Sequence, residues 1–276
     1  MTAHPRPGSR AARRPRRVAA FFDLDKTIIA TSSVFAFNKS FLGEGLLSRR
    51  SVLELAYTQL AYSLSGADDD QMAKVRQAMA TATKGWEPEK VERIVTEALT
   101  EIVRPTVFAE AQDLLDEHRA LGHDLVIVSA SGEELVAPIS RMLGADHYAG
   151  TRMTRDADGR YGGEIEFYCQ GKGKAEAVRA FAQRYGYDLE SSYAYSDSST
   201  DLPMLEEVAH PTAINPDRTL RREALERGWP ILTFENPTPL LPTFEPATGP
   251  IVGVGSILFA VGAAALSFGA AARRQR

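Results

Sequence analysis

The stretch Val18-Ala-Ala-Phe-Phe-Asp-Leu-Asp-Lys-Thr27 carries the first prediction about this chain. Its apolar run, Val18 to Phe22, indicates a buried strand, and two carboxylates one residue apart, Asp23 and Asp25, follow directly. Because ligands of open α/β sheets bind at the carboxyl ends of the strands, we expect chemistry at this point. The stretch alone also allows a simpler interpretation, in which Asp25 or Thr27 only caps the helix after the strand.

The composition indicates a globular protein that does not bind nucleic acid. The 276 residues are enough for one large domain or two modest ones, and 44% of them are hydrophobic. The net charge of −4 conceals an acidic body, because six arginines lie in residues 1–17 and three in residues 273–276. An acidic body lacks the clustered cations that phosphate backbones require. The single cysteine, Cys169, excludes an internal disulfide and is typical of a reducing compartment.

The two ends of the chain differ from its body. Residues 1–17 are expected to be a disordered basic arm, and the apolar run after it is too short for a signal peptide. Residues 251–272 are 22 residues without a charge, the length of a membrane-spanning helix, and they follow a linker at 234–250 with five prolines. We expect a cytoplasmic catalytic domain anchored to the membrane by residues 251–272. The alternative is that this helix is buried or docked on the surface.

Strands and helices alternate along the rest of the chain, which predicts an α/β fold with a Rossmann-like parallel sheet core. The core is expected to consist of residues 18–32 and 104–233. Its predicted strands are 18–22, 124–129, 193–196, 211–215 and 230–233, its predicted helices are 106–121, 133–143, 174–186 and 217–227, and a hairpin is expected at 149–155 and 160–167.

Residues 33–103 contain no convincing strand pattern. Four helical stretches are predicted there instead, at 33–42, 46–64, 69–83 and 88–102. This insertion follows the first strand, so we expect it to form an all-helical cap domain over the carboxyl ends of the strands. With the C-terminal hydrophobic helix, it completes the predicted architecture.

Further reactive side chains follow the later strands and loops, and the parallel sheet should bring them together with Asp23 and Asp25. They are Ser129, Lys174, Asp197 and Asp201. Four carboxylates without a histidine or cysteine cluster form a hard, all-oxygen site that suits Mg²⁺ better than zinc. A lysine, a hydroxyl and helix N-termini would complete a phosphate site.

Two carboxylates one residue apart can take separate roles at such a site. One can attack phosphorus, and the other can transfer protons to the leaving group and from water. Three alternatives remain open at this point. Lys172 could take the place of Lys174, Ser131 could replace or assist Ser129, and Asp201 could merely cap the short helix that follows it.

These motifs, taken in order, resemble those of the haloacid dehalogenase-like phosphatases. Asp23-Leu-Asp-Lys-Thr27 is similar to their D-x-D-x-T motif, Ser129 to their second motif, Lys174 to their third, and Asp197-Ser-Ser-Thr-Asp201 to their fourth. The resemblance spans about residues 18–233. A helical insertion between the first two motifs is similar to that of the phosphoserine phosphatase-like branch.

The resemblance implies a role for each of these residues. Asp23 would be the nucleophile that forms an aspartyl-phosphate, and Asp25 the general acid and base. Thr27 would orient the second carboxylate within the phosphate site, Ser129 would hold a phosphate oxygen with Ser131 as helper or substitute, and Lys174 would bridge nucleophile and phosphate. The Mg²⁺ would be bound by Asp23, the backbone carbonyl of Asp25, Asp197 and Asp201.

The sequence also departs from that branch. Phosphoserine phosphatases usually carry a substrate-reading glutamate nine residues after the nucleophile, and this chain has Ser32 there. We therefore predict an Mg²⁺-dependent phosphomonoester hydrolase whose substrate is a small phosphorylated metabolite, phosphoserine-like or other. The alternatives are a membrane-tethered regulatory protein that binds phosphorylated ligands with little turnover, and a phosphotransferase on the same fold.

Overall fold

The structure is a computed structural model that describes residues 17–47 and 69–236. Three predicted segments lie outside these residues: nearly all of the basic arm, most of the helix at 46–64, and the linker with the C-terminal hydrophobic helix after residue 236. Within the described residues, no helix combines the length and the apolar character needed to cross a membrane.

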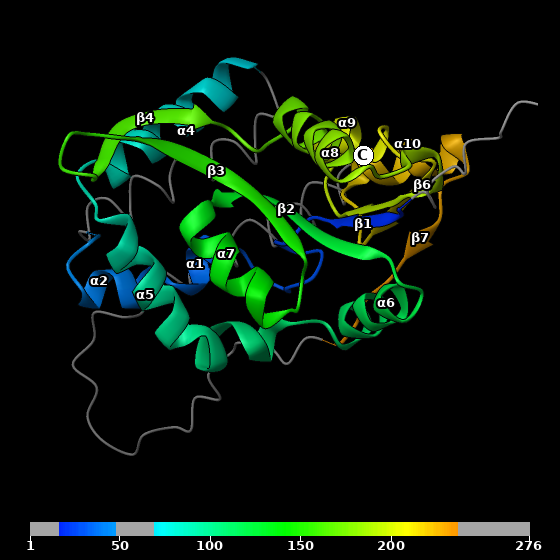
Figure 1. Cartoon of the computed structure of the whole chain (residues 1–276), viewed down its shortest axis with the longest axis horizontal. Helices are drawn as coiled ribbons and strands as arrows, with labels where there is room; N and C mark the ends of the chain where they lie inside the picture. Colours follow the sequence, from blue (N-terminus) through cyan, green and yellow to red (C-terminus); the bar gives the residue numbers. More distant parts are fainter. Residues whose placement is uncertain (1–16, 48–68, 237–276) are drawn as a thin grey trace, which may run out of the picture. The chain divides into compact units, whose positions relative to one another are not determined.

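A seven-stranded sheet forms the centre of the described part (Figure 1). Its spatial order is β4-β3-β2-β1-β5-β6-β7, and every neighbouring pair is parallel except β3 with β4. This confirms the predicted α/β class with a parallel-dominated sheet. The strands are β1 (Ala19–Phe22), β2 (Asp124–Gly132), β3 (His147–Arg155), β4 (Tyr161–Phe167), β5 (Tyr193–Ser196), β6 (His210–Ile214) and β7 (Ile231–Leu232).

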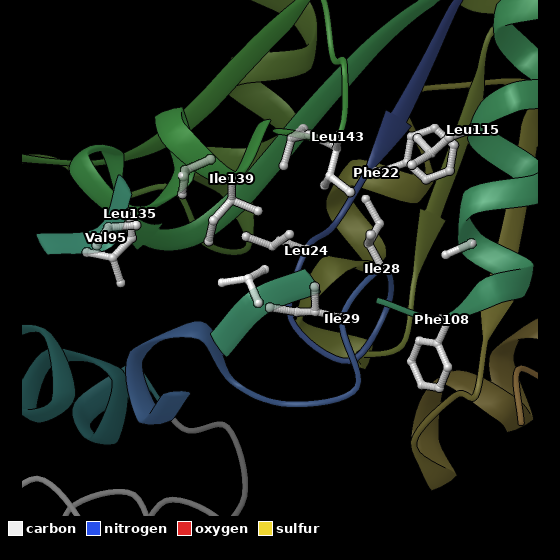
Figure 2. Close-up of a cluster of buried hydrophobic side chains, with 14 of the residues drawn as sticks. Phe22, Leu24, Ile28, Ile29, Val95, Phe108, Leu115, Leu135, Ile139 and Leu143 are labelled. Carbon is white, nitrogen blue, oxygen red and sulfur yellow. The ribbon is translucent and has the colours of Figure 1, made fainter. Parts of the chain in front are cut away.

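The central strand β1 is buried on both faces, which explains its unbroken apolar sequence. Alternate side chains point to opposite faces, so Phe22 packs with α6 (Ala109–Ala120) and α7 (Glu133–Met142), as Figure 2 shows for Phe22, Leu115 and Ile139. On the other face, Phe21 packs with α8 (Lys172–Tyr185), α9 (Leu202–Leu205) and α10 (Arg218–Arg227). Helices thus cover both faces of the sheet.

Two predicted elements of the sheet differ from the structure. The strand predicted to end at Ser129 continues to Gly132, because an irregularity in register after Val128 lets β2 keep pairing with β3 as far as Thr151. The predicted hairpin is present, but its first arm, β3, is also a strand of the main sheet and pairs in parallel with β2.

All described elements between β1 and β2 are helical. Before α6, they are α1 (Ser33–Ala36), α2 (Asn38–Gly43), α4 (Asp69–Thr83), α5 (Pro88–Ala98), a π-helical turn (Leu99–Val103) and a 3-10 turn (Arg104–Thr106). The predicted helix at 33–42 is thus divided into two short helices, whereas the one at 69–83 has the expected bounds.

The inserted helices are tied to the hairpin of β3 and β4. Tyr161 accepts a backbone hydrogen bond from Gly85 (2.8 Å) and donates one to Trp86 (2.9 Å), in the turn between α4 and α5. Arg160 forms an ion pair with Glu87 at 2.7 Å. These bonds hold α4 against β4, and α4 contributes Met79 to the pocket described below.

Candidate active site

The carboxyl edge of the sheet gathers the predicted reactive residues, because the strands that carry them are parallel. Phe22 of β1 is paired with Ile127 of β2 on one side and with Tyr195 of β5 on the other. Asp23, the next residue, therefore lies level with the ends of both neighbours, and its N–H still donates to the Tyr195 carbonyl at 2.9 Å.

In the turn after β1, the side chains of the two acids and of the residue between them lie in different environments. Leu24 is fully buried in the apolar cluster drawn in Figure 2, whereas Asp23 and Asp25 line the pocket. The chain then reverses at Lys26, which has a φ of +63° and donates its N–H to the Ile29 carbonyl at 2.6 Å. A positive φ is uncommon for a lysine and costs conformational energy, which the hydrogen bond to Ile29 helps to offset.

Asp23 is fixed by a lysine and a threonine. Lys174 Nζ lies 2.5 Å from Asp23 Oδ1 and 2.6 Å from Asp201 Oδ2, and the lysine side chain is buried. The hydroxyl of Thr27 donates to Asp23 Oδ2 at 3.1 Å and lies 3.5 Å from Asp197 Oδ1. Thr27 thus contacts Asp23 and Asp197, whereas the resemblance implied that it orients the second carboxylate of the motif, and it is not among the residues that line the pocket.

Asp25 is held by hydroxyls from two segments. The backbone N–H of Ser33 donates to Oδ1 at 2.8 Å, and the Ser33 hydroxyl lies 3.2 Å from Oδ2. The Ser131 hydroxyl also lies 3.2 Å from Oδ2 and 2.8 Å from the Ser33 hydroxyl. Ser129 Oγ accepts the Ser131 N–H at 3.2 Å, and both Ser129 and Ser131 line the pocket.

The fourth predicted segment joins the site through Asp197 and Asp201. Asp201 is buried, and Ser196 donates to its Oδ2 at 2.7 Å, the oxygen that also accepts from Lys174. Asp197 lines the pocket, and its backbone carbonyl accepts the N–H of Asp217 at 2.8 Å. The Asp217 carboxylate in turn accepts from Ser199 N–H at 2.7 Å, which fixes the loop between the two acids.

These residues surround one pocket with a volume of about 290 Å³. Every predicted site residue except Thr27 lines it, and so do several residues outside the predicted catalytic and metal-binding set. The additional lining residues are Lys26, Ser32, Val34, Met79, Ala130, Tyr168, Gln170, Ser198 and Thr200.

Burial sets the protonation behaviour of the acids. Desolvation raises the pKa of Asp23 to about 8 despite the opposing charge of Lys174. Desolvation and the neighbouring Asp201 raise the pKa of Asp197 to about 6. Burial also raises the pKa of Asp25, against the bonds from Ser33. When they are ionised, the four aspartates of the pocket carry more negative charge than its single buried lysine offsets.

Comparisons with known proteins agree with this geometry. The family model for haloacid dehalogenase-like hydrolase matches residues 20–206. The chain belongs to the haloacid dehalogenase-like hydrolases. It is 52% identical to a probable phosphatase of Mycobacterium tuberculosis over 264 residues, covering 96% of this chain and 90% of that protein. It is 35% identical to a phosphoserine phosphatase of the same species, covering 78% of this chain and 70% of that protein.

A solved structure shares the fold of this family member. A substrate-bound phosphoserine phosphatase superposes with a TM-score of 0.58 at 18% identity, covering 81% of this chain and 95% of that one. The family match and the names of the relatives confirm the prediction of a haloacid dehalogenase-like phosphatase, a phosphoric monoester hydrolase.

The donor set of this family member fits a hard divalent cation. Asp23, Asp25 and Asp197 present oxygens alone, and a cation would offset the excess of buried negative charge. In the described ranges, no group of three or more histidine, cysteine, aspartate or glutamate side chains is arranged to hold a metal by itself. Mg²⁺ usually takes only a few carboxylate oxygens from a protein and keeps waters and a substrate phosphate among its ligands.

The position of Lys174 depends on a close approach of the backbone at Gly173. A Cβ on residue 173 would lie 1.9 Å from the carbonyl oxygen of Tyr168, so only glycine fits there. Lys174 follows directly and reaches the acids from the first turn of α8, whereas Lys172 is exposed. The structure thus places Lys174, and not Lys172, against Asp23 and Asp201.

Gly173→Ala is expected to displace the first turn of α8 and with it Lys174. Because the obstructing atom is backbone, we expect a loss of about 1–3 kcal/mol in the free energy of unfolding and about a hundredfold loss of kcat. Urea unfolding and p-nitrophenyl phosphate turnover would measure both. Gly43→Ala is the matched control, since a Cβ there meets nothing within 4 Å. Equal behaviour of the two variants would contradict this role for Gly173.

Several residues of the site lay beyond sequence reasoning. Ser33 was expected only as a helix start, yet it holds Asp25 through both its N–H and its hydroxyl. Asp217 was predicted as the first residue of the helix at 217–227, and the structure shows it as the N-cap of α10. No sequence pattern indicated its bond to Ser199 in the loop after Asp197. Tyr168 and Gln170 follow a hairpin arm and lack any motif.

Proposed function

We propose that this chain hydrolyses phosphate monoesters of small metabolites in two steps, with Asp23 as the nucleophile. The observation that carries the proposal is the contact of Lys174 Nζ with both Asp23 and Asp201, in a pocket that also presents Asp25 and two serines. A buried cation against a carboxylate that faces a pocket is suited to bring that carboxylate to a phosphate dianion.

In the first step, a carboxylate oxygen of Asp23 attacks phosphorus, and the bond from phosphorus to the ester oxygen breaks. Asp25 gives its proton to the departing alkoxide. Its raised pKa favours the protonated form, and the bonds from Ser33 and Ser131 fix its orientation. The products of this step are a free alcohol and a phosphoryl group on Asp23.

In the second step, water attacks the phosphorus of the aspartyl-phosphate, and Asp25 accepts the proton of that water. The bond between phosphorus and the Asp23 oxygen breaks, which restores the carboxylate and releases inorganic phosphate. Ser129 and Ser131 are proposed to donate to phosphate oxygens in both steps, and Lys174 to bridge Asp23 and the phosphate. Thr27 keeps Asp23 in position through its hydroxyl.

Mg²⁺ is the proposed cofactor, held by Asp23, the backbone carbonyl of Asp25, and Asp197. Asp201 is proposed to contribute through Oδ1, because its Oδ2 already accepts from Lys174 and Ser196. When bound, the cation would supply positive charge to the phosphate oxygens and to the attacking carboxylate.

Removal of divalent cations is expected to abolish turnover, and added Mg²⁺ to restore it. Asp197→Asn should raise the Mg²⁺ concentration for half-maximal activity by about tenfold or more, because it removes a charged ligand. Activity on p-nitrophenyl phosphate, titrated with Mg²⁺ after treatment with EDTA, measures this. Asp113→Asn is the control on an exposed helix position. Full activity in EDTA would contradict the metal assignment.

The runner-up is a membrane-tethered regulatory protein that binds phosphorylated ligands with little turnover. Its support is the uncharged stretch at 251–272, from which the anchor remains a prediction. Asp25, held ready beside the pocket, favours an enzyme, since a ligand-binding protein has no use for a proton donor at the leaving group. A phosphotransferase on the same fold would give the same phosphorylated intermediate but release no inorganic phosphate. Phosphate release with Mg²⁺ therefore separates the hydrolase from both alternatives, and the phosphorylated intermediate separates the phosphotransferase from the binding protein.

A further inference from the structure

One wall of the pocket comes from the loop between β4 and α8, residues 168–171, which contains none of the residues proposed to take part in the reaction. Tyr168 and Gln170 of this loop line the pocket together with Lys26 and Ser32. The position at which the phosphoserine phosphatase-like branch carries a glutamate is Ser32 here. Ser32 is uncharged, so any recognition of charge at this wall falls to Lys26.

The loop is built rigidly. Gln170 donates its backbone N–H to the Tyr168 carbonyl at 2.9 Å, and its own carbonyl accepts from Gly173 at 3.0 Å. The close approach at Gly173 fixes the Tyr168 carbonyl from the other side. Arg76 of α4 lies over the Tyr168 ring, 5.8 Å from its centroid. The Gln170 side chain is thus presented by a stiff segment, as a recognition residue requires.

The orientation of the Gln170 amide is also fixed. The hydroxyl of Tyr168 donates to Gln170 Oε1, which uses the acceptor end of the amide. The Nε2 end, with two N–H donors, is then the part of this side chain that a ligand can bind. Gln170 therefore offers hydrogen-bond donors to a substrate.

The charge of the described pocket wall also favours a substrate with hydrogen-bond acceptors. Outside the four reacting acids and Lys174, Lys26 is the one charged residue among the described lining residues, and it is a cation. Three of the acids are already engaged, Asp23 and Asp201 by Lys174 and Asp25 by serines. At this wall, a leaving group with oxygen acceptors meets the N–H donors of Gln170 and the cation of Lys26, whereas an ammonium group meets the like charge of Lys26.

We propose that Gln170 and Lys26 select phosphate monoesters whose leaving group carries carboxylate or hydroxyl oxygens, and disfavour esters that carry an ammonium group. Tyr168 acts as a positioning residue through the Gln170 amide. This inference rests on the proposed phosphatase function and names the substrate class of the same pocket.

Two matched pairs of esters test the inference in the full-length protein with Mg²⁺. The first pair is 3-phosphoglycerate and O-phosphoserine of the same configuration, and the second is ethylene glycol monophosphate and phosphoethanolamine. Each pair differs only by a hydroxyl in place of an ammonium group. We expect kcat/KM to favour the hydroxyl member by about tenfold or more in both pairs, because an unpaired charge against donors is strongly rejected.

Gln170→Glu should reverse or abolish this preference, since it replaces two N–H donors by a carboxylate. Gln170→Leu should reduce it without adding charge, and Tyr168→Phe should reduce it mainly through KM. Gln183→Glu, at an exposed position of α8, makes the same chemical change away from the pocket and should leave the ratio unchanged. The ratio within a pair is the readout, because a new charge near the phosphate would lower both rates.

Turnover of p-nitrophenyl phosphate is measured beside the pairs, so that the phosphatase function is tested separately from the substrate preference. If the wild-type protein hydrolyses it but prefers the ammonium esters, rejects both hydroxyl esters, or keeps its ratio in Gln170→Glu, the inference is overturned and the phosphatase function stands. If wild-type protein with Mg²⁺ hydrolyses no phosphate ester, the proposed function itself is overturned, and the inference with it.

Discussion

Asp23→Asn should reduce the turnover of p-nitrophenyl phosphate by about four orders of magnitude or more while the protein remains folded. The amide that replaces the carboxylate is a poor nucleophile, so the bond to phosphorus does not form. Its carbonyl oxygen can still accept from Lys174 or from Thr27, the two partners of the native side chain. Rates of phosphate release at saturating Mg²⁺ measure the loss.

The stability of this variant separates a chemical effect from a structural one. Burial raises the pKa of Asp23 to about 8, which shows that its charged form is costly at this position. Removal of the charge should therefore leave the Tm unchanged or raise it, and Lys174 keeps Asp201 as its partner. Full activity in a folded Asp23→Asn protein would be incompatible with the proposed mechanism.

Lys174→Met is expected to lower both stability and activity. The lysine is 2% exposed and lies between two buried carboxylates, so its loss leaves both without a cation. Removal of one partner from a buried ion pair costs about 3–5 kcal/mol in the free energy of unfolding. Activity should fall by about a thousandfold or more, because the charge that faces the phosphate is lost. Urea unfolding and steady-state kinetics measure the two effects.

Lys172→Met provides the matched control, since it removes the same charge two residues earlier on the same helix. Lys172 is exposed and does not line the pocket, so its free energy of unfolding and kcat should stay close to those of the wild type. If Lys172→Met were the inactive variant and Lys174→Met the active one, the assignment of the bridging lysine would be wrong.

The convergence of distant residues was predictable because it depends on topology. Apolar strands that alternate with helices indicate a parallel sheet, and the residues after β1, β2 and β5 must then meet at one edge. This topology predicts that Asp23, Ser129 and Asp197 lie close together, and in the structure all three line one pocket. Lys172 remained an alternative to Lys174 at the sequence level, because both lysines lie near the start of a predicted helix.

Other parts of the site depend on contacts that leave no pattern. The continuation of β2 through Ser131 results from its pairing with β3, a strand expected only as a hairpin arm. The bond from Ser33 to Asp25 depends on how the chain turns after the first strand. Gln170 owes its orientation to Tyr168 two residues away, which neither propensity nor periodicity predicts.

The central claim is that a phosphoryl group is carried by Asp23 during turnover. The most direct test is to stop the reaction in acid within milliseconds and identify the labelled peptide by mass spectrometry, with wild-type protein and Asp23→Asn side by side. We predict one phosphoryl group on Asp23, removed by hydroxylamine as expected for an acyl phosphate and absent from the variant. A phosphoryl group on Ser129, Ser131 or any other residue, or turnover without a labelled intermediate, would contradict the account.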